Sequence, residues 1–345
     1  MKVSIIIKAW NEESNVARAI ESCLRALGNV EGEVILADSL SSDRTVQIAS
    51  AYPIKIVQLA NASDRGCGAA PQLGYQHSSG EFIYLIDGDM ALDPSFLPAA
   101  LKALHDDSQL AGVGGIVKDM NLKGLEFASR AARVKADLRP GDVDRLDGGG
   151  LYRRSAIESV SYFTDRNLHA FEEFELATRL REKGWRLIRL DKLAVEHYGY
   201  EVGAYTLLWR RVTGGYALGA GEVLRAVAGR RSLFETIRKV RTLWTSLMIV
   251  AWAASMGAVW ILGSSVWQMT ITSGLLFITP FMLMILRRRS VKLGIYAVAA
   301  WIVLTFSAIR GLLRRRTDPC AWISSRIIQD KTLSLAPSGA ARAGV

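Results

Sequence analysis

The first 200 residues alternate short apolar runs with amphipathic stretches. The runs are rich in aliphatic and β-branched residues and are five residues long, which is the pattern of buried strands. They occupy residues 3–7, 33–37, 54–58 and 82–86. Strands that alternate with helical stretches predict βαβ units, so we expect an α/β domain with a mostly parallel sheet over residues 1–200. Ligands of such sheets bind beyond the carboxyl ends of the strands, which directs attention to the segments after Ile7, Ala37 and Ile86.

Two further stretches carry weaker patterns. Residues 118–146 show little periodicity, and we interpret them as a variable insertion or an acceptor-side loop. Residues 201–241 predict amphipathic linker helices in which aromatic side chains mix with arginines. A helix of this composition fits a membrane interface, and it equally fits ordinary packing against a core.

The hydrophobic pattern changes after residue 241. Residues 242–286 contain no charged side chain, and a third apolar run follows. A span needs about 20 apolar residues, so we predict a membrane region over residues 242–313. Its spans are expected at about 243–262, 266–286 and 291–310, before a basic tail at 314–345.

The orientation of the third run is open. The arginine clusters 287–289 and 314–316 are both expected on the cytoplasmic side, because basic residues favour that side. Both clusters cannot lie there if exactly three helices cross. Either the third run is re-entrant or interfacial, or one cluster violates the tendency; we expect three spans because the run at 293–309 is uncharged.

Charge is distributed unevenly along the chain. The net charge is +10, yet residues 222–345 carry 17 Lys and Arg against 4 Asp and Glu, so the remainder is slightly acidic. Basic residues that flank apolar runs fit phospholipid headgroups better than nucleic acid, so we expect a lipid bilayer and no nucleic acid among the partners.

Cysteine usage and the N-terminus bear on the compartment. The three cysteines, Cys23, Cys67 and Cys320, are widely spaced and odd in number, which fits a reducing compartment rather than a disulfide framework. Lys8 ends the first apolar run too early for a secretory leader. The expected location is therefore the inner or cell membrane, multi-pass, with the N-terminal domain cytoplasmic.

An acidic pair follows the fourth strand. Asp87 and Asp89 flank Gly88 directly after the apolar run that ends at Ile86. Two carboxylates at a strand end can hold a hard divalent cation, which in turn can bridge the phosphates of a nucleotide diphosphate. Alone, such a pair is more often a solvated turn.

Four segments together give the pair more weight. They are residues 4–13 (SIIIKAWNEE), 34–45 (VILADSLSSDRT), 65–74 (RGCGAAPQLG) and 172–185 (EEFELATRLREKGW). In order and spacing, over about residues 3–200, the chain resembles the family 2 glycosyltransferases, whose fold is GT-A, a Rossmann-like nucleotide-diphospho-sugar transferase domain. The chain departs from the family pattern at Lys8, Trp10 and Leu40, where proline, tyrosine and glycine are usual.

The resemblance implies roles for residues at the strand ends. Asp38 matches a residue that contacts the uracil or ribose of the donor, and the opening motif adds donor contacts from Ala9, Asn11 and Glu12. Asp89 matches a metal ligand, and Asp87 a residue that contacts ribose or the metal site; the expected cation is Mn²⁺ or Mg²⁺.

The resemblance also implies roles for later residues. Glu173 stands where the family places its catalytic base, with Glu172 as the alternative; an acidic helix start favoured by the helix dipole would contain the same residues. His197 matches a third metal ligand in some relatives, although a lone histidine after a strand is often structural. Arg210 and Arg211 lie where some relatives bind the donor diphosphate.

These expectations combine into a functional hypothesis. We predict a membrane-anchored inverting glycosyltransferase that moves a sugar from a nucleotide-sugar, with UDP the expected carrier, to a lipid-linked or saccharide acceptor. One alternative is a polyprenyl-phosphate glycosyltransferase that makes a lipid-phosphate sugar carrier. A non-catalytic membrane-bound binding or scaffold protein is a third reading.

Overall fold

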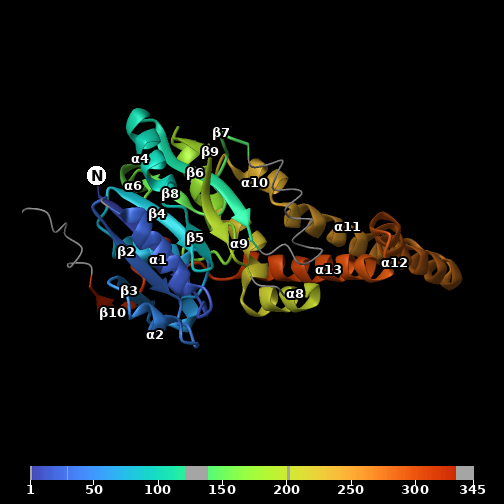
Figure 1. The fold of residues 1–345 in the computed structure, drawn as a ribbon. Helices are drawn as coiled ribbons and strands as arrows, with labels where there is room; N and C mark the ends of the chain where they lie inside the picture. Colours follow the sequence, from blue (N-terminus) through green and yellow to red (C-terminus); the bar gives the residue numbers. More distant parts are fainter. Residues whose placement is uncertain (1, 29, 121–138, 200–202, 332–345) are drawn as a thin grey trace, which may run out of the picture. The chain divides into compact units, whose positions relative to one another are not determined.

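The protein divides into two compact units. The computed structural model describes residues 2–28, 30–120, 139–199 and 203–331, and most of the predicted insertion at 118–146 lies outside them. One unit, called here the α/β unit, comprises residues 1–202 and 316–345. The other, called here the helical unit, comprises residues 203–315. Figure 1 traces the order of the elements along the chain.

The α/β unit alternates strands and helices from its first residues, as predicted. In chain order it contains β1 Val3–Ala9, α1 Val16–Leu27, β2 Gly32–Asp38, α2 Thr45–Ala49, β3 Lys55–Leu59, the short helix η1 Ala62–Asp64, α3 Ala69–Gln76, β4 Phe82–Asp87, β5 Met90–Leu92, α4 Phe96–Asp106, β6 Leu110–Asp119, β7 Gly141–Asp142, β8 Gly150–Arg153, α6 Arg154–Glu158, α7 Glu172–Glu182, β9 Arg186–His197 and β10 Ser325–Asp330.

One sheet joins these strands. Over the described residues it is 10-stranded, in the order β10-β3-β2-β1-β4-β8-β6-β9-β5, with β7 beside β9. The strands β3, β2, β1 and β4 are parallel, whereas β8 runs antiparallel to both β4 and β6. The expected mostly parallel sheet therefore describes the N-terminal half, and the sheet as a whole is mixed.

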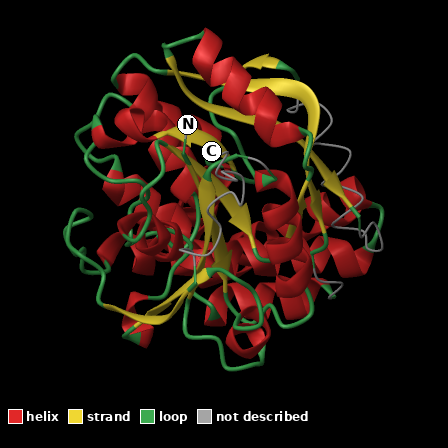
Figure 2. Ribbon diagram, turned by 60° about the vertical axis from the view of Figure 1, so that its left-hand side comes forward, coloured by secondary structure: helices red, strands yellow, loops and turns green. Residues whose placement is uncertain are grey.

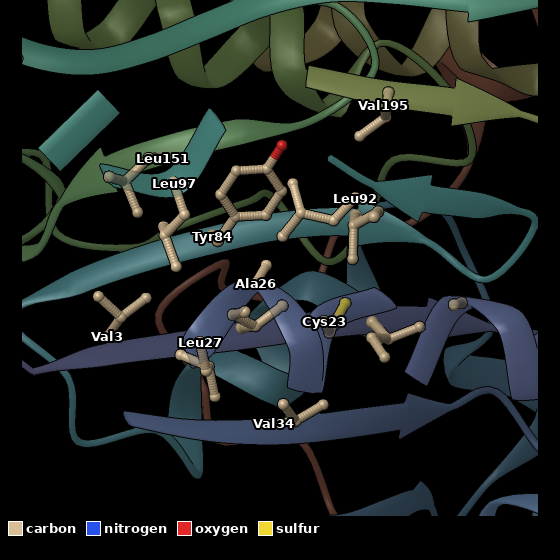
Figure 3. Packing of buried hydrophobic residues seen from close by; sticks show 14 of the residues in the cluster. Val3, Cys23, Ala26, Leu27, Val34, Tyr84, Leu92, Leu97, Leu151 and Val195 are labelled. Atoms are coloured by element: carbon tan, nitrogen blue, oxygen red, sulfur yellow. The ribbon is translucent and has the colours of Figure 1, made fainter. Parts of the chain in front are cut away.

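Two apolar layers cover the two faces of the sheet, whose strands Figure 2 shows in yellow among the red helices. Side chains alternate across a strand, so Val3, Ile5 and Ile7 of β1 face the layer that contains α1 and α4. Ile6 faces the opposite layer, with α3, α6 and α7. Figure 3 shows the first layer, in which Tyr84 of β4 lies among aliphatic side chains. Burial on both faces explains why these strands read as continuous apolar runs.

The segment after the last apolar helix returns to the α/β unit. β10 pairs antiparallel with β3 at the edge of the sheet (Figure 1). Just before it, Ile323 is fully buried, and its backbone N–H and carbonyl both hydrogen-bond the side-chain amide of Gln76. At the start of the segment, Arg316 forms an ion pair of 2.9 Å with the buried Asp165. Residues 316–331, expected within a basic tail, thus contribute a strand to the sheet.

The helical unit contains both short and long helices. They are α8 Ala204–Thr213, the short helix η2 Tyr216–Leu218, α9 Gly219–Ala226, α10 Leu233–Lys239, α11 Arg241–Leu262, α12 Val266–Arg288 and α13 Val291–Leu313. The last three are long and apolar enough to cross a membrane. Their bounds lie within a few residues of the apolar runs in the sequence.

Candidate active site

The site is built at the carboxyl ends of three adjacent parallel strands. In the sheet register Ala9 of β1 lies opposite Asp38 of β2, and Lys8 lies opposite Asp87 of β4. Ser39 N–H donates to Ala9 O, and Gly88 N–H donates to Lys8 O, each at 2.9 Å, so the loops leave the strands in fixed positions. The register thus brings together the segments after Ile7, Ala37 and Ile86, to which the strand-end rule pointed.

Asp38 is buried at the end of β2. Its Oδ2 accepts hydrogen bonds from Ser41 N–H at 3.0 Å and from Gln58 Nε2 at 2.8 Å. Its Oδ1 is buried without a hydrogen-bond partner in the structure. A buried carboxylate oxygen normally has a partner, so this atom is suited to accept a hydrogen bond from a ligand.

The loops after β1 and β2 are tied together by polar contacts. Asn11, in the left-handed region at φ 57°, accepts a hydrogen bond from Ser42 N–H at 2.7 Å. The backbone N–H of Glu12 donates to Thr45 Oγ1 at 2.7 Å. Arg65 reinforces the second loop by donating to the carbonyls of Ser39 and Leu40. Asn11 and Glu12 therefore shape the loop beside Asp38.

Lys8 forms the charged centre of the site. Its Nζ lies 2.8 Å from Glu172 Oε1 and 3.0 Å from Asp87 Oδ1, and its side chain is only 16% exposed. Burial alone would lower the pKa of Lys8, but the attraction of Asp87 and Glu172 outweighs it and raises that pKa well above its usual value. Burial raises the pKa of Asp87, and the Lys8 ammonium opposes that rise. A charged lysine thus links the acidic pair after β4 to the start of α7.

Glu173 has a different environment from Glu172. Both of its carboxylate oxygens accept from Gly149 N–H, at 3.2 Å and 3.4 Å. Burial raises the pKa of Glu173 to about 8; the carboxylates of Glu172, Asp147 and Asp87 add to this, and Lys8 opposes it. Of the two neighbours, Glu172 is paired with a cation, whereas Glu173 holds its proton near neutral pH. This difference favours Glu173 for proton transfer.

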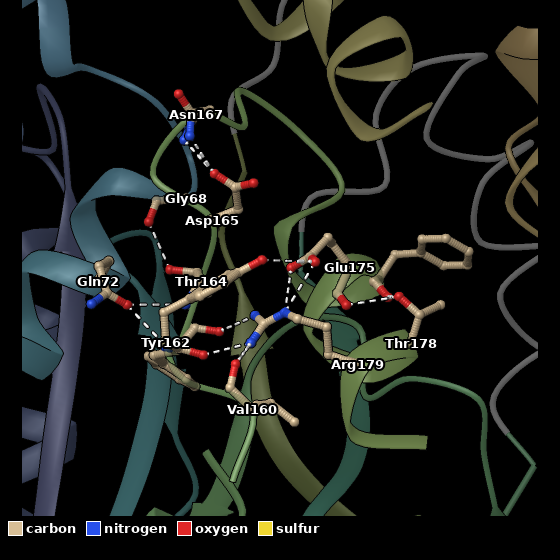
Figure 4. A network of polar contacts seen from close by, with 12 residues as sticks. Gly68, Gln72, Val160, Tyr162, Thr164, Asp165, Asn167, Glu175, Thr178 and Arg179 are labelled. Atoms are coloured by element: carbon tan, nitrogen blue, oxygen red, sulfur yellow. Dashed lines mark hydrogen bonds and ion pairs between the residues drawn. The ribbon is translucent and has the colours of Figure 1, made fainter. Parts of the chain in front are cut away.

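A buried network fixes α7 and so places both glutamates. Arg179 Nε donates to both oxygens of Glu175 at 3.0 Å and 2.9 Å (Figure 4). Its guanidinium also donates to the carbonyls of Val160, Tyr162 and Phe163 in the preceding loop. That loop is anchored on α3 through Gln72, whose side-chain oxygen accepts from the backbone of Phe163 and Thr164. Arg179, within the segment 172–185 that carries the family resemblance, therefore fixes α7 to this loop.

His197 and Asp89 lie together near the end of β9. His197 Nε2 is 3.2 Å from Asp89 Oδ2, and Nδ1 is 2.7 Å from Asp119 Oδ1. Burial disfavours the charged ring, but hydrogen bonds with Asp89 and Asp119 prevail and raise the pKa of His197 to about 9. The register explains the contacts, since Asp119 of β6 and Met90 of β5 both lie opposite His197.

The side chains near Asp89 fit a divalent cation that is held by few protein ligands. Within the described part of the chain, no three His, Cys, Asp or Glu side chains group into a complete metal site. Asp89 and His197 could supply two ligands, and a carboxylate placed as Asp119 is, against the other ring nitrogen, commonly orients a ligating histidine. Mg²⁺-type sites are often held by one or two protein ligands plus substrate phosphates, so these residues fit that pattern. Asp87 is directed to Lys8 instead.

The remaining predicted residues lie elsewhere. Arg210 and Arg211 are in α8 of the helical unit, and their role toward a donor stays a prediction. The sequence analysis did not predict three residues of the site: Lys8 as a counter-ion, Asp119 behind His197, and Gly149 as the donor to Glu173. Only the unusual lysine and the triple glycine at 148–150 gave a signal.

Comparison with known proteins identifies the family. The model of Glycosyl transferase family 2 matches residues 4–161. The putative glycosyltransferase EpsE of Bacillus subtilis is 30% identical over 205 residues, 55% of this chain and 70% of that one. The dolichol-phosphate mannosyltransferase of Pyrococcus furiosus is 29% identical over 172 residues, and the match spans 46% of this chain and about half, 48%, of that relative.

A solved structure shares the fold. The mannosyltransferase PcManGT from Pyrobaculum calidifontis, in complex with GDP-Man and Mn²⁺, superposes with a TM-score of 0.59 at 18% identity, covering 90% of this chain and 86% of that one. This likeness supports the expected GT-A architecture. The sequence relatives and the matched family model lead to one conclusion: the chain is a glycosyltransferase and belongs to family 2.

Proposed function

We propose that this enzyme is an inverting glycosyltransferase that transfers a sugar from a nucleotide-sugar to a lipid-linked or saccharide acceptor at a membrane. One observation carries the proposal. Glu173, with a pKa of about 8, stands beside the acidic strand end that contains Asp87. A base whose pKa is near the working pH is suited to take a proton from an attacking hydroxyl.

The reaction follows from the groups present. The acceptor oxygen attacks the anomeric carbon while Glu173 takes its proton, and the bond between that carbon and the diphosphate oxygen breaks. The nucleoside diphosphate leaves with the bonding electron pair. At pH 7, about one Glu173 in ten is ionised in the resting enzyme, given a pKa near 8. Lys8 holds Glu172 in place through an ion pair of 2.8 Å, so its role is positional.

The donor and the cation have separate support. The unpartnered Asp38 Oδ1 is suited to accept a hydrogen bond from a nucleoside, and UDP is the proposed carrier. The relative solved with GDP-Man and Mn²⁺ supports both a nucleotide-sugar donor and a divalent cation. When bound, Mn²⁺ or Mg²⁺ would be held by Asp89 and His197 and would supply positive charge to the leaving diphosphate.

A polyprenyl-phosphate acceptor is the second candidate. The name of the Pyrococcus furiosus relative and the three apolar helices favour it. A phosphate acceptor is already ionised and needs no strong base. Glu173→Gln should then retain most of the activity, whereas a hydroxyl acceptor requires a large loss.

The helices also support a location. We propose a multi-pass protein of the cell membrane whose α/β unit faces the cytoplasm, because basic clusters flank the apolar helices at residues 287–289 and 314–316. Acceptors that are themselves lipids would then be within reach of the enzyme.

A donor screen tests the proposed function. Protein purified in detergent is incubated with UDP- and GDP-sugars in the presence of Mn²⁺, Mg²⁺ or EDTA, and nucleotide release is measured beside Asp89→Ala. We expect cation-dependent release from one donor that the variant loses. If no donor is turned over even with membrane lipid extract added, the proposal is refuted. Asp89→Ala at the wild-type rate would refute the metal site alone.

A further inference from the structure

The chain enters and leaves the helical unit from the same folded unit. Residues 1–202 precede the helices and residues 316–331 follow them, and both segments belong to the α/β unit. β10 is hydrogen-bonded to β3 in the central sheet, and Ile323 is buried in the second apolar layer. One sheet can lie on only one side of a bilayer. A chain that starts and finishes on one side crosses the bilayer an even number of times, so three crossings are incompatible with this sheet.

α13 contacts residues 204–226, a segment whose helices are too short to cross a bilayer. Near its start, Tyr296 Oη donates to Ala204 O at 3.1 Å, and the rings of Tyr296 and Tyr205 are 4.9 Å apart. Near its end, Gly311 packs so closely on η2 that an added Cβ would overlap Leu218 O. Figure 1 shows α8 and α9 beside α13. Residues 204–226 therefore hold α13 near its start and near its end, and between these contacts Ala297 and Val298 pack on Met284 of α12.

The segment 204–226 has the character of an interface. It consists of α8, η2 and α9, each much shorter than the roughly 20 residues that a span requires. It contains Arg210 and Arg211, and Trp209 is 69% exposed. A short aromatic and basic helix is suited to lie in the plane of the headgroups.

The far end of α13 is fixed by charge as well. Glu222 of α9 is fully buried, and its Oε1 lies 3.1 Å from Arg314 Nη1 directly after α13. Gly221 of α9 meets the helix so closely that an added Cβ would overlap Ala308 O. A buried charged pair loses stability when its partners separate, so these contacts keep the end of α13 at α9.

The three apolar helices differ in how they are covered. The most apolar stretches of α11 and α12 are 0% and 6% buried, whereas that of α13 is 39% buried. α11 and α12 contact each other through Trp252, whose Nε1 donates to Leu276 O at 2.8 Å and whose ring lies beside Phe277. A turn of three residues, 263–265, connects them. Two exposed apolar helices joined by a short turn can cross a bilayer and return.

We propose that the chain crosses the membrane twice, through α11 and α12, and that α13 lies with α8 in the interface on the side of the α/β unit. The exposed apolar side chains of α13, among them Phe306 at 65%, then face the lipid of that leaflet. This arrangement places both arginine clusters, 287–289 and 314–316, on one side, which three spans cannot do. It replaces the expected third span and rests on the membrane location proposed above.

Cysteine labelling tests the arrangement. Cys320 is exposed and follows α13, so the natural protein already carries a reporter, and Cys67→Ser removes the other accessible thiol while Cys23 stays buried. Ser265→Cys and Ser290→Cys, each with Cys320→Ser, report the two turns. Asp106→Cys marks the α/β unit. Bacterial spheroplasts that express each variant are treated with a membrane-impermeant maleimide before or after permeabilisation.

The expected pattern is specific. Ser265→Cys reacts in intact spheroplasts, whereas Cys320, Ser290→Cys and Asp106→Cys react only after permeabilisation. Reaction of Cys320 in intact spheroplasts would refute the two crossings. The two crossings would also be refuted if, in intact spheroplasts, Ser265→Cys did not react and an antibody did not recognise an epitope inserted between Ser264 and Ser265. Release of the protein from membranes by alkaline carbonate would instead refute the membrane location itself. Neither test measures sugar transfer, so both are independent of the proposed activity.

Discussion

Replacing Glu173 by glutamine should weaken catalysis and, at alkaline pH, strengthen the fold. Glutamine resembles the protonated carboxyl and keeps an oxygen that can accept from Gly149 N–H. It cannot take a proton from an acceptor hydroxyl. Removing a general base typically lowers kcat by about 10²- to 10⁴-fold, and we expect a loss in that range.

The effect on stability follows from the pKa of Glu173. That pKa is about 8 in the folded enzyme against an ordinary value of 4.5, so the folded state retains the proton that the unfolded chain loses. The contribution of Glu173 to the free energy of unfolding is therefore at its full value below pH 4.5, decreases as the pH rises toward 8, and is constant above pH 8. At about 1.4 kcal/mol per pKa unit, the largest loss of unfolding free energy between low and high pH is about 5 kcal/mol. Partial solvent exposure of Glu173 reduces this loss to a few kcal/mol.

Two measurements on one pair of proteins check this reasoning. Thermal unfolding in detergent is compared for the wild type and Glu173→Gln at pH 5 and pH 9, since the difference between variants isolates one carboxyl. We expect similar midpoints at pH 5 and a higher midpoint for the variant at pH 9. Wild-type transfer should rise with pH and level off near pH 8.

A neighbouring variant serves as the control. Glu172→Gln removes a carboxylate that pairs with Lys8 at 2.8 Å, so it should lower stability at both pH values. If Glu173→Gln showed no relative gain at pH 9, the argument from burial would be wrong. If it retained full activity, Glu173 would not be the base, and the phosphate acceptor would be favoured.

Three other substitutions test separate parts of the site. Lys8→Met should destabilise the enzyme by about 3–5 kcal/mol because it leaves Asp87 and Glu172 without their cation. Adding Glu172→Gln to Lys8→Met should restore part of this loss in unfolding experiments, and equal stability of the single and the double variant would contradict the pairing. Gly149→Ala should destabilise by more than the 1–3 kcal/mol typical of a strained backbone, because its φ is +89° and a Cβ would overlap Leu85 O; Gly184→Ala, at φ +88° in open space, is the matched control and should show only the smaller loss. Asp119→Asn should weaken Mn²⁺ binding about 10- to 100-fold in electron paramagnetic resonance titrations with UDP, with Asp106→Asn unchanged; unaltered affinity would show that Asp119 does not orient His197.

Local pattern was sufficient for the elements and for part of the site. The apolar runs at residues 3–7 and 82–86 became β1 and β4, because burial on both faces leaves a continuous apolar stretch in the sequence. The strand-end rule then located Asp38 and Asp87 without any coordinates. The helix at residues 172–182 was visible because its start is acidic and glycine follows its end.

Some local patterns misled. Asn11 is of a residue type that often caps helices, but it turns the chain in the left-handed region and accepts a hydrogen bond from Ser42 N–H, and α1 begins only at Val16. The residue type was right for a cap, but a contact with the neighbouring loop competes with that role. Such a contact depends on the register between β1 and β2, which no short segment specifies.

Only the tertiary structure decided which distant groups meet. Lys8 reaches Glu172 across 164 positions, and His197 reaches Asp119 across 78. Whether a lysine or a glutamate is charged depends on these partners and on burial, so the pKa values of the site could not be read from the motifs. The return of β10 to the sheet was equally hidden, because a strand at a sheet edge has a weak periodic signal of its own. Sequence patterns record which faces are buried, whereas the sheet register and long-range packing determine what each buried face meets.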